Sequence, residues 1–518
     1  MDIKNLFLSD STLTDHYTCQ EQQRQEYIAN LSLLTLKYHT PLSLIKQARI
    51  LAAALMRNDT ELCKFLLNHY KYDLPTVLKT CQILDSRRLV NQLERKTPRI
   101  KSKRKLSAHN SIISNLKSLN EGLEVSLTKS KSKVIITEWI NKLSAADLEM
   151  LALQYPKGQW RKLTDLLHTR NDDFQLEWFN KYVWDKPVPD NCVVSKFAQV
   201  TEENIVALVR EYKPNYSYLR SQCRKLVNDD VLAIVTAYTP MDQIFHHWEA
   251  FQNQQEQVLK RLTTEGADMP YGALMKHLQN LDTELPVAKE LTRIAGIRLE
   301  EYDIDIQHPV VVLGDASSSM DVAIRTSSII TSVLCSLFDA KLHLFRTVDE
   351  PIENPPRTVQ DVVKMGRELR ADGCTAPGAS LKPFLDTKEI VKTFIIVTDE
   401  IENTSASGAW LGNSEEWFAP LFRKYREEVY PAKLVFVSFL PDRRDGQMVT
   451  ALKNLIPDIE KDLTQFILDL GNPDLRKLDD LLNKLTLETD TYQQELAEQL
   501  KKDWHWINKQ DSSRCNIQ

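Results

Sequence analysis

Five oxygen-bearing side chains occupy positions from which they could share one metal ion. They come from an Asp-x-Ser-x-Ser motif, a glycine turn and the end of an apolar segment: Asp315, Ser317, Ser319, Thr375 and Asp399. Carboxylates and hydroxyls are hard ligands, which suit Mg²⁺, Mn²⁺ or Ca²⁺ better than Zn²⁺. The residue types therefore predict a divalent cation site, with Mg²⁺ as the expected ion.

The Asp315 turn alone has a simpler explanation, because Asp and Ser are good turn and capping residues. The other two segments favour the metal site. Apolar strands are expected at 308–315 and 393–399, so Asp315 and Asp399 each end a strand, and Thr375 lies in a turn before a helix. In a parallel sheet, ligands bind beyond the carboxyl ends of the strands. If hydroxyls dominate the inner shell, the ion keeps positive charge and can accept an anionic oxygen from a partner.

The elements that would position these donors alternate between strand and helix. Strands are expected at 308–315, 341–345, 393–399, 433–440 and 466–470, and helices at 323–338, 359–369, 415–428 and 448–455. Alternation of this kind, with some strands apolar throughout, is typical of a parallel sheet covered on both faces. We therefore predict a doubly wound α/β domain at 305–475 and a charged helical tail at 476–518.

The first 300 residues show successive amphipathic helices instead. Glycine is scarce there, with five of the 13 in the chain. One helix is expected over 40–56, with Thr40 as its cap and Pro41 at its start; others are expected at 145–154, 160–168, 174–183, 202–212, 227–237, 241–262 and 270–281. Short helices joined by short turns favour helical hairpins of the HEAT type, although no fixed repeat period is visible. We predict an all-α module over 1–300.

A basic segment at 95–133 interrupts this helical pattern, and we expect it to be an exposed, mobile loop. Its first part holds seven cations: Arg95, Lys96, Arg99, Lys101, Lys103, Arg104 and Lys105. RNA binding requires such residues against phosphates, with aromatic surfaces for unpaired bases. A solvated loop or a nuclear import signal explains the same charges equally well.

Two more basic clusters lie beside aromatic residues. The first contains Lys157, Arg161, Lys162, His168 and Arg170, near Tyr155 and Trp160, and the second contains Arg220, Arg224 and Lys225, near Tyr216 and Tyr218. The first is a candidate for RNA contact. For both clusters, a charged outer face of a helix whose apolar side chains lie in the core is the simpler explanation.

Composition sets further limits on function. The net charge of −5 gives no global attraction to nucleic acid, so anion binding must come from local patches. No apolar run approaches a membrane span, no secretory signal is visible, and the eight cysteines form no CxxC pair, which together favour a cytoplasmic protein with reduced thiols. The chain has no phosphate-binding Gly-rich loop and no Gly-x-Ser-x-Gly elbow. An ion beside Asp399 and Glu400 could in principle activate water, but we expect no enzyme.

The metal motif and its strands, over about 305–471, resemble the von Willebrand factor A domain and its metal-ion-dependent adhesion site (MIDAS). The resemblance implies that Ser317, Ser319 and Thr375 contact the ion through their hydroxyls. It also implies that Asp315 and Asp399 act directly or through water. A sixth position would be open to a partner.

Longer segments resemble the Ro autoantigen family. They are FIIVTDEIENTSASG (394–408), LFRKYREEVYPAKLVFVSF (421–439), DRRDGQMVTAL (442–452), ADMPYGALMKHLQNLD (267–282) and WRKLTDLLHTRNDDFQLEWFNKYV (160–183). Their order is also that family's order, with a TROVE module of helical repeats first and an A domain last. Glu400 departs from the family, which more often has an amide there.

This resemblance implies a ring of helical repeats whose ends are joined by the A domain. It also implies a basic cavity that takes the ends of misfolded RNA and an outer face that binds small noncoding RNAs. We therefore expect an RNA-binding protein of RNA quality control, without catalysis, in the cytoplasm, with the nucleus as an additional candidate location. The alternative is a protein-interaction scaffold without RNA, in which the ion binds an acidic residue of a partner and the helical module is a docking surface.

Overall fold

The computed structural model describes residues 3–8, 11–37, 40, 42–69, 72–120, 123, 125–266, 269–302, 304, 306–410, 413–441, 445–486 and 490–501. The chain forms two compact units. The helical unit comprises Met1–Gln257 with Gln493–Gln518, and the sheet unit comprises Val258–Tyr492. The end of the predicted tail, from residue 502 on, lies outside the described residues. None of the described helices is long and apolar enough to cross a membrane.

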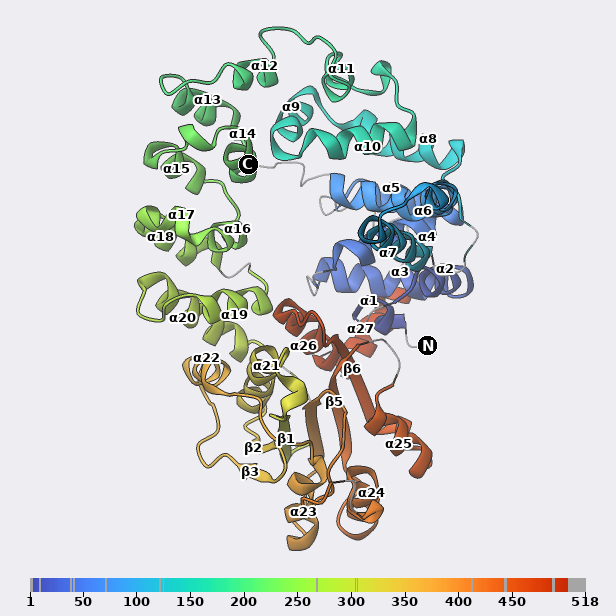
Figure 1. Ribbon diagram of the computed structural model, residues 1–518, viewed down its shortest axis with the longest axis vertical. Coiled ribbons are helices and arrows are strands. Elements are labelled where there is room, and N and C mark those ends of the chain that lie inside the picture. The colour runs from blue at the N-terminus through green and yellow to red at the C-terminus, as the bar shows by residue number, and fades with distance from the viewer. Residues whose placement is uncertain are drawn as a thin grey trace. The chain divides into compact units, whose positions relative to one another are not determined.

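The helical unit confirms the all-α prediction, since its described residues contain helices and no strand (Figure 1). Its α-helices are α1 (Ile3–Leu8), α2 (Leu13–Gln22), α3 (Arg24–Ser32), α4 (Leu44–Met56), α5 (Thr60–Leu67), α6 (Leu74–Lys96), α7 (Lys103–Asn120), α8 (Lys129–Glu138), α9 (Ala145–Gln154), α10 (Lys157–Leu167), α11 (Phe179–Val183), α12 (Val193–Ala198), α13 (Ile205–Tyr212), α14 (Tyr216–Gln222), α15 (Asp229–Thr236), α16 (Met241–His246) and α17 (Trp248–Phe251). Consecutive helices pack against one another, as α6 and α7 do.

Three expectations for this unit are wrong in detail. Helix α4 begins at Leu44 rather than near Pro41, because the Ser43 hydroxyl, not Thr40, accepts the first backbone amide, from Lys46 at 3.4 Å. The expected helix at 241–262 is broken into α16, α17 and α18 (Gln255–Glu265). The break falls where His247 leaves the helical conformation, at φ −115° and ψ 30°. The expected helix at 174–183 is reduced to the short α11.

The basic segment at 95–133 is largely helical, so the prediction of a loop is wrong. Helix α6 continues to Lys96, a 3-10 turn covers Thr97–Arg99, and α7 starts at Lys103. The physical reason is an apolar stripe within the charges. Ile113 is buried, and Leu106 and Leu116 are half-buried on the same side, where α7 packs on α6.

The sheet unit confirms the predicted doubly wound α/β architecture. Its strands are β1 (Val310–Asp315), β2 (Lys341–Phe345), β3 (Asp349–Pro351), β4 (Thr393–Thr398), β5 (Lys433–Leu440) and β6 (Leu463–Asp469), in the order β3-β2-β1-β4-β5-β6. All neighbours are parallel except the β2–β3 edge pair. Its helices are α19 (Tyr271–Asn280), α20 (Pro286–Glu300), α21 (Ile324–Leu337), α22 (Val359–Glu368), α23 (Pro377–Thr387), α24 (Phe418–Glu428), α25 (Gln447–Leu455) and α26 (Leu478–Thr486), while α18 and α27 (Asp490–Leu500) run across its boundaries.

The sheet is buried on both faces. Helices α23, α24 and α25 cover one face, where aromatic side chains such as Phe394, Phe422 and Phe436 form the centre of a large apolar cluster. Helix α21 lies across β1 and β4 on the other face and packs against α22. Strands β1 and β4 therefore lie in the middle of the sheet, and every residue of both strands is buried.

Helices α19 and α26 belong to the same compact unit as the sheet, although they lie outside the expected range of 305–475. Asp479 of α26 accepts hydrogen bonds from the backbone amides of Tyr271 and Gly272, both at 2.7 Å, at the start of α19. Arg367 of α22 donates to the carbonyl of Leu278, at 2.8 Å, near the other end of α19. Hydrogen bonds from α26 at one end of α19 and from α22 near its other end therefore hold α19 within the sheet unit.

Candidate functional site

The two central strands bring the two aspartates of the metal motif together. Strands β1 and β4 are parallel neighbours, with Gly314 opposite Val397, so Asp315 and Asp399 leave the sheet at the same edge. The hydroxyl of Thr398 donates to Oδ2 of Asp315 at 2.6 Å. This hydrogen bond ties the end of β4 directly to the first residue of the motif.

The serine turn folds back over the same edge. The amide of Ser317 donates to Oδ1 of Asp315 at 2.9 Å, and the hydroxyls of Ser317 and Ser319 are 3.1 Å apart. The amide of Ser318 donates to the carbonyl of Gly373 at 3.1 Å. The serine turn is therefore bonded both to the strand end and to the turn that carries Thr375.

The Thr375 turn is held in place by the loop that follows Asp399. Oδ1 of Asn403 accepts the amide of Thr375 at 3.0 Å, and the carbonyl of Thr375 accepts the amides of Asn403 and Thr404 at 3.2 and 3.1 Å. Gly373 has φ +77°, a conformation that side chains rarely adopt. The three segments that carry the five expected donors are thus interlocked by hydrogen bonds at one point of the sheet edge.

The electrostatics of this point suit a cation. Burial and the neighbouring Asp399 raise the pKa of Asp315 from 3.8 to about 7, against hydrogen bonds from Ser317 and Thr398 that lower it. Burial likewise raises the pKa of Asp399, and Oδ2 of Asp399 is buried with no hydrogen-bond partner among the described residues. An unsatisfied buried carboxylate oxygen beside a second carboxylate is costly, and a bound cation would satisfy it. The donor set therefore fits a hard divalent ion.

Only one of the five expected donor residues is exposed. Asp315, Ser317, Thr375 and Asp399 are buried, whereas Ser319 is exposed. A partner oxygen would therefore reach the ion from the Ser319 side. Within the described part of the chain, no group of three or more His, Cys, Asp or Glu side chains is placed to hold a metal ion.

Glu400, the residue after Asp399, does not join the site. Its carboxylate accepts hydrogen bonds from Ser438, from the amide of Val449 at 3.0 Å and from Gln465 at 2.8 Å. Burial raises its pKa, and these bonds counteract that rise. The carboxylate is bound by groups on β5, α25 and β6, so it would not be placed to activate a water on an ion held by the five expected donors.

Four exposed apolar side chains lie on segments that adjoin the candidate metal site. We call Val322, Val348, Ile401 and Trp410 the apolar rim; they are 65, 58, 45 and 63% exposed. Each lies on a segment joined to a donor turn. The amide of Ile401 donates to Asp399 at 3.0 Å, Trp410 forms a β-bridge with Thr404, and Thr347, next to Val348, accepts the amide of Cys374 at 3.1 Å. Apolar side chains grouped in this way are typical of interaction surfaces.

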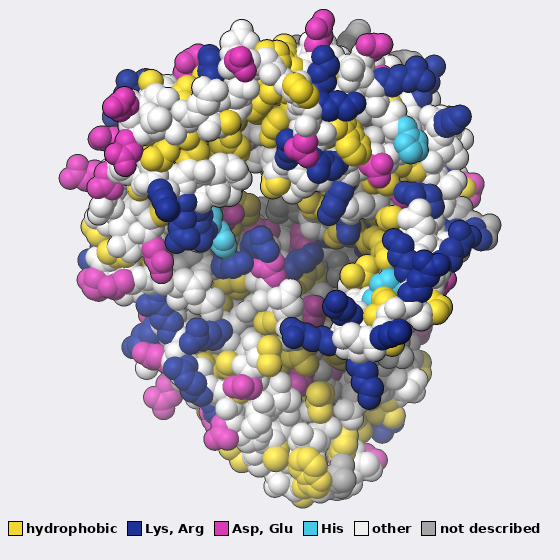
Figure 2. Space-filling view, turned by 45° about the horizontal axis from the view of Figure 1, so that its top comes forward, with side chains coloured by type: hydrophobic (Ala, Val, Ile, Leu, Met, Phe, Trp, Pro, Cys, Tyr) yellow, Lys and Arg dark blue, Asp and Glu magenta, His cyan; other side chains and the backbone are white. Residues whose placement is uncertain are grey.

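The seven cations of the basic segment are all exposed, on the last turn of α6, the short link and the first turn of α7. None of the seven forms an ion pair within the described part of the chain. The first turn of α7 contains no acidic residue, so Lys103, Arg104 and Lys105 face the positive end of the helix dipole. Figure 2 shows Lys and Arg side chains crowded at the right of the view, the side on which Figure 1 draws α6 and α7.

The second candidate RNA cluster is split by the structure. Lys157 and Arg161 both pair with Asp185, and Arg161 also donates to the carbonyl of Val183 at 3.0 and 2.9 Å. These contacts fasten α10 to the segment after α11. Lys162, His168 and Arg170 are exposed, and Trp160 is fully buried, which confirms its expected place in the core.

Sequence reasoning did not single out Thr398 or Asn403, which position Asp315 and Thr375. Thr398 was visible only as the residue before Asp399 at the end of an apolar strand. Asn403 has no signal in the sequence, because its role depends on how the loop after β4 folds back onto the Thr375 turn.

Comparisons with known proteins give similarity at the level of structure only. No family model and no curated protein matches the sequence. A von Willebrand factor type A protein from Catenulispora acidiphila is 16% identical with a TM-score of 0.24, over 34% of this chain and 41% of that chain. The chain is also similar to the Ro (RSR) protein of Deinococcus radiodurans, at 12% identity and a TM-score of 0.48, over 88% of this chain and 93% of that one.

Proposed function

We propose that this chain is an RNA-binding protein of the Ro type, which binds small noncoding or misfolded RNA in RNA quality control and catalyses no reaction itself. The observation that carries the proposal is the row of seven exposed cations at the α6–α7 turn, none of which has an acidic partner among the described residues. Phosphates would neutralise these charges and would also complement the start of α7. The segments that resemble the Ro family support the same function, and such a protein would act in the cytoplasm, with the basic segment as a candidate nuclear import signal.

We also propose that Asp315, Ser317, Ser319, Thr375 and Asp399 hold a divalent cation, with Mg²⁺ as the expected ion. The unsatisfied Oδ2 of Asp399 and the raised pKa of Asp315 support this assignment. A bound ion would supply an open coordination position for an anionic oxygen. The serine turn and the Thr375 turn would orient the three hydroxyls, and Asn403 and Thr398 would keep those turns in place.

A salt titration of RNA binding tests the first proposal. The probe is a hairpin RNA with a short single-stranded 3′ tail, and the variant is Arg99→Ala with Lys101→Ala. Each lost phosphate contact should reduce the slope of log affinity against log salt by about 0.7 to 0.9. The matched control is Lys260→Ala with Lys364→Ala, which removes the same charge from exposed positions on α18 and α22. Failure of the unmodified protein to bind this RNA at low salt would exclude the proposed function.

The apolar rim favours a second function, a metal-dependent protein-interaction scaffold without RNA. A partner would present an Asp or Glu to the ion and apolar side chains to Val322, Ile401 or Trp410. The variant Asp315→Ala separates the two functions. It should abolish capture of such a partner, yet leave RNA affinity nearly unchanged, because the basic segment lies in the helical unit.

A further inference from the structure

The link between α6 and α7 carries a serine in the middle of the cations of the basic segment. Ser102 lies between Lys101 and Lys103, and its side chain is exposed. Its carbonyl accepts the amide of Leu106 at 2.9 Å, so Ser102 is the residue immediately before α7. Its hydroxyl forms no hydrogen bond with any described residue. The hydroxyl is therefore accessible from solvent and available for reaction.

The backbone around Ser102 is not helical. The 3-10 turn after α6 ends at Arg99, Ile100 is extended at φ −90° and ψ 105°, and α7 starts at Lys103. Residues 100–102 belong to no helix or strand. A partner enzyme can therefore read this short segment in an extended conformation, with little unwinding of the helices on either side.

The other two hydroxyl residues between positions 95 and 107 are less suitable for modification. The hydroxyl of Thr97 donates to the carbonyl of Leu93 at 3.2 Å, and its side chain is half-buried. Ser107 is exposed but lies within α7, so an enzyme that needs an extended substrate would have to unwind this helix. Ser102 alone in this stretch combines exposure, a free hydroxyl and a non-helical backbone.

The charge around Ser102 is entirely positive. Arg99 lies three residues before it, Lys101 and Lys103 flank it, and the sequence from Lys96 to Asn120 contains no Asp or Glu. Arg99, Lys101 and Lys103 are exposed and have no acidic partner in the described part of the chain. Opposite charges steer association and discriminate between partners. These cations therefore suit an enzyme whose substrate groove is acidic.

We propose that Ser102 is phosphorylated by a serine kinase with an acidic substrate groove, and that the phosphate weakens RNA binding by the basic segment. In this reaction Oγ of Ser102 attacks the γ-phosphorus of ATP, and the bond between that phosphorus and the bridging oxygen of ADP breaks. ADP leaves, and the hydroxyl proton passes to a base of the kinase. The regulation rests on the RNA-binding function proposed above.

The phosphate would act on the same cations that RNA would contact. It adds about −1.5 to −2 charge and three acceptor oxygens at a position flanked by Lys101 and Lys103. Charge-assisted hydrogen bonds from these side chains would compete with bonds to RNA phosphates. The first turn of α7 contains no acidic residue, so a negative charge at Ser102 would also stabilise the start of this helix.

Phosphate transfer to the full chain tests the modification site. The probes are Mg²⁺ with ATP and the catalytic subunit of cAMP-dependent protein kinase, used as a serine kinase with an acidic groove. We expect tandem mass spectrometry to place the phosphate on Ser102, and Arg99→Ala to slow transfer roughly 10-fold or more, the effect of one lost charge-assisted contact. Ser107→Ala is the matched control and should be modified as fast as the unmodified sequence. A chain whose Ser102 stays unphosphorylated would overturn the site.

A salt titration with the tailed hairpin RNA tests the regulation. Phosphorylation should lower the slope of log affinity against log salt by about 1.4 to 1.8, because two cations are withdrawn from RNA. Ser102→Asp should lower it by about half as much. Ser102→Asn is the control, since Asp and Asn cap a helix about equally well and differ in charge. An unchanged slope after phosphorylation would refute the regulation.

Hydrogen exchange separates this inference from the function on which it rests. Backbone amides at the start of α7 should exchange about 2- to 5-fold more slowly after phosphorylation, whether or not RNA binds. If the unmodified protein binds no RNA while Ser102 is phosphorylated and α7 exchanges more slowly, the RNA-binding function fails and the modification site stands. If RNA binds and phosphorylation changes neither exchange nor the salt slope, the proposed role of Ser102 is wrong.

Discussion

A methyl group at position 272 should separate α19 from α26. A Cβ added at Gly272 would overlap the carbonyl oxygen of Leu475 and would lie 2.8 Å from both Cα of Arg476 and Oδ2 of Asp479. Two of these atoms are backbone, so α19 must move away. Overpacking costs about 1 to 3 kcal/mol, and each hydrogen bond to a charged acceptor is worth about 1.5 to 3 kcal/mol. Because two such bonds join Asp479 to α19, we expect Gly272→Ala to lower the stability of this contact by about 3 to 6 kcal/mol.

Hydrogen–deuterium exchange of the full chain measures this loss where it occurs. Backbone amides of α19 and α26 should exchange at least about 100-fold faster in Gly272→Ala, since 1.4 kcal/mol corresponds to a factor of ten. The matched control is Gly296→Ala in α20, where an added Cβ meets no atom within 4 Å. That change should instead stabilise the helix by about 0.5 to 1 kcal/mol. If both variants exchange alike, α26 does not close onto α19 and the limits of the sheet unit are wrong.

Three further outcomes are expected. When Mg²⁺ is added back after chelation, the melting temperature of the sheet unit should rise. The free energy of unfolding should increase by about 2.7 kcal/mol at a Mg²⁺ concentration 100 times the dissociation constant. Asp315→Ala should abolish this response, whereas Asp321→Ala, at an exposed neighbouring residue, should keep it. Burial raises the pKa of Glu402 from 4.5 to about 8, so the folded protein holds a proton that the unfolded chain releases, and stability should fall as pH rises through that window. Glu402→Gln keeps the acceptor for the amide of Phe418 and should remove this fall, worth at most about 5 kcal/mol, in urea unfolding at pH 5 and pH 9. Gly446→Ala would place a Cβ 2.7 Å from Oε1 of Glu400 and closer still to its other carboxylate atoms. This substitution should therefore destabilise the sheet unit by about 1 to 3 kcal/mol in the same urea unfolding assay. An unchanged urea midpoint would contradict the position of the Glu400 side chain.

The sheet could be predicted well because its strands are apolar and bounded by turns. Strands β2 and β5 occupy the expected residues 341–345 and 433–440. Strand β3 was missed, since Asp349–Pro351 is short, polar and at an edge, with no alternation to reveal it. The sequence could predict that the donors of the metal motif lie at the same edge of the sheet, because the carboxyl ends of parallel strands meet there. The residues that hydrogen-bond to these donor segments, Thr398 and Asn403, could not be predicted, because their contacts depend on the conformation of the loops.

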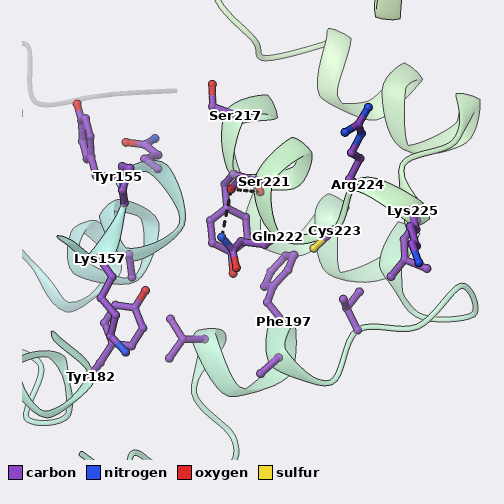
Figure 3. Close-up of a pocket in the computed structure, with 18 residues that line it drawn as sticks. Tyr155, Lys157, Tyr182, Phe197, Ser217, Ser221, Gln222, Cys223, Arg224 and Lys225 are labelled. Carbon is purple, nitrogen blue, oxygen red and sulfur yellow. Dashed lines mark hydrogen bonds between the residues drawn. The ribbon is translucent and has the colours of Figure 1, made fainter. Parts of the chain in front are cut away.

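The helical unit was harder to predict from the sequence. The many charged and serine residues predict a loop where α7 forms. Only three apolar residues indicate the helix, and such a narrow stripe is hard to recognise among so many charged residues. Lys157 and Arg161 looked like free cations, yet their partner Asp185 lies more than twenty residues away in sequence. A cavity in the helical unit (Figure 3) is lined by Tyr155, Tyr182 and Tyr218 from three helical regions, so no local pattern indicated it.

Glu400 has φ +60°, a conformation that costs a non-glycine residue roughly 1 to 2 kcal/mol. At this backbone turn the two consecutive carboxylates have different partners: Asp399 interacts with Ser319, and Glu400 is bonded to β5 and α25. Substitutions at position 400 are therefore limited by two requirements, the positive φ and the hydrogen bonds of the carboxylate. Glycine would adopt the positive φ but would lose the carboxylate that accepts three hydrogen bonds. A β-branched residue would disfavour the positive φ and would shift the neighbouring Asp399. A substitution of Glu400 therefore has to be accompanied by changes at Ser438 and Gln465, whose side chains donate to its carboxylate.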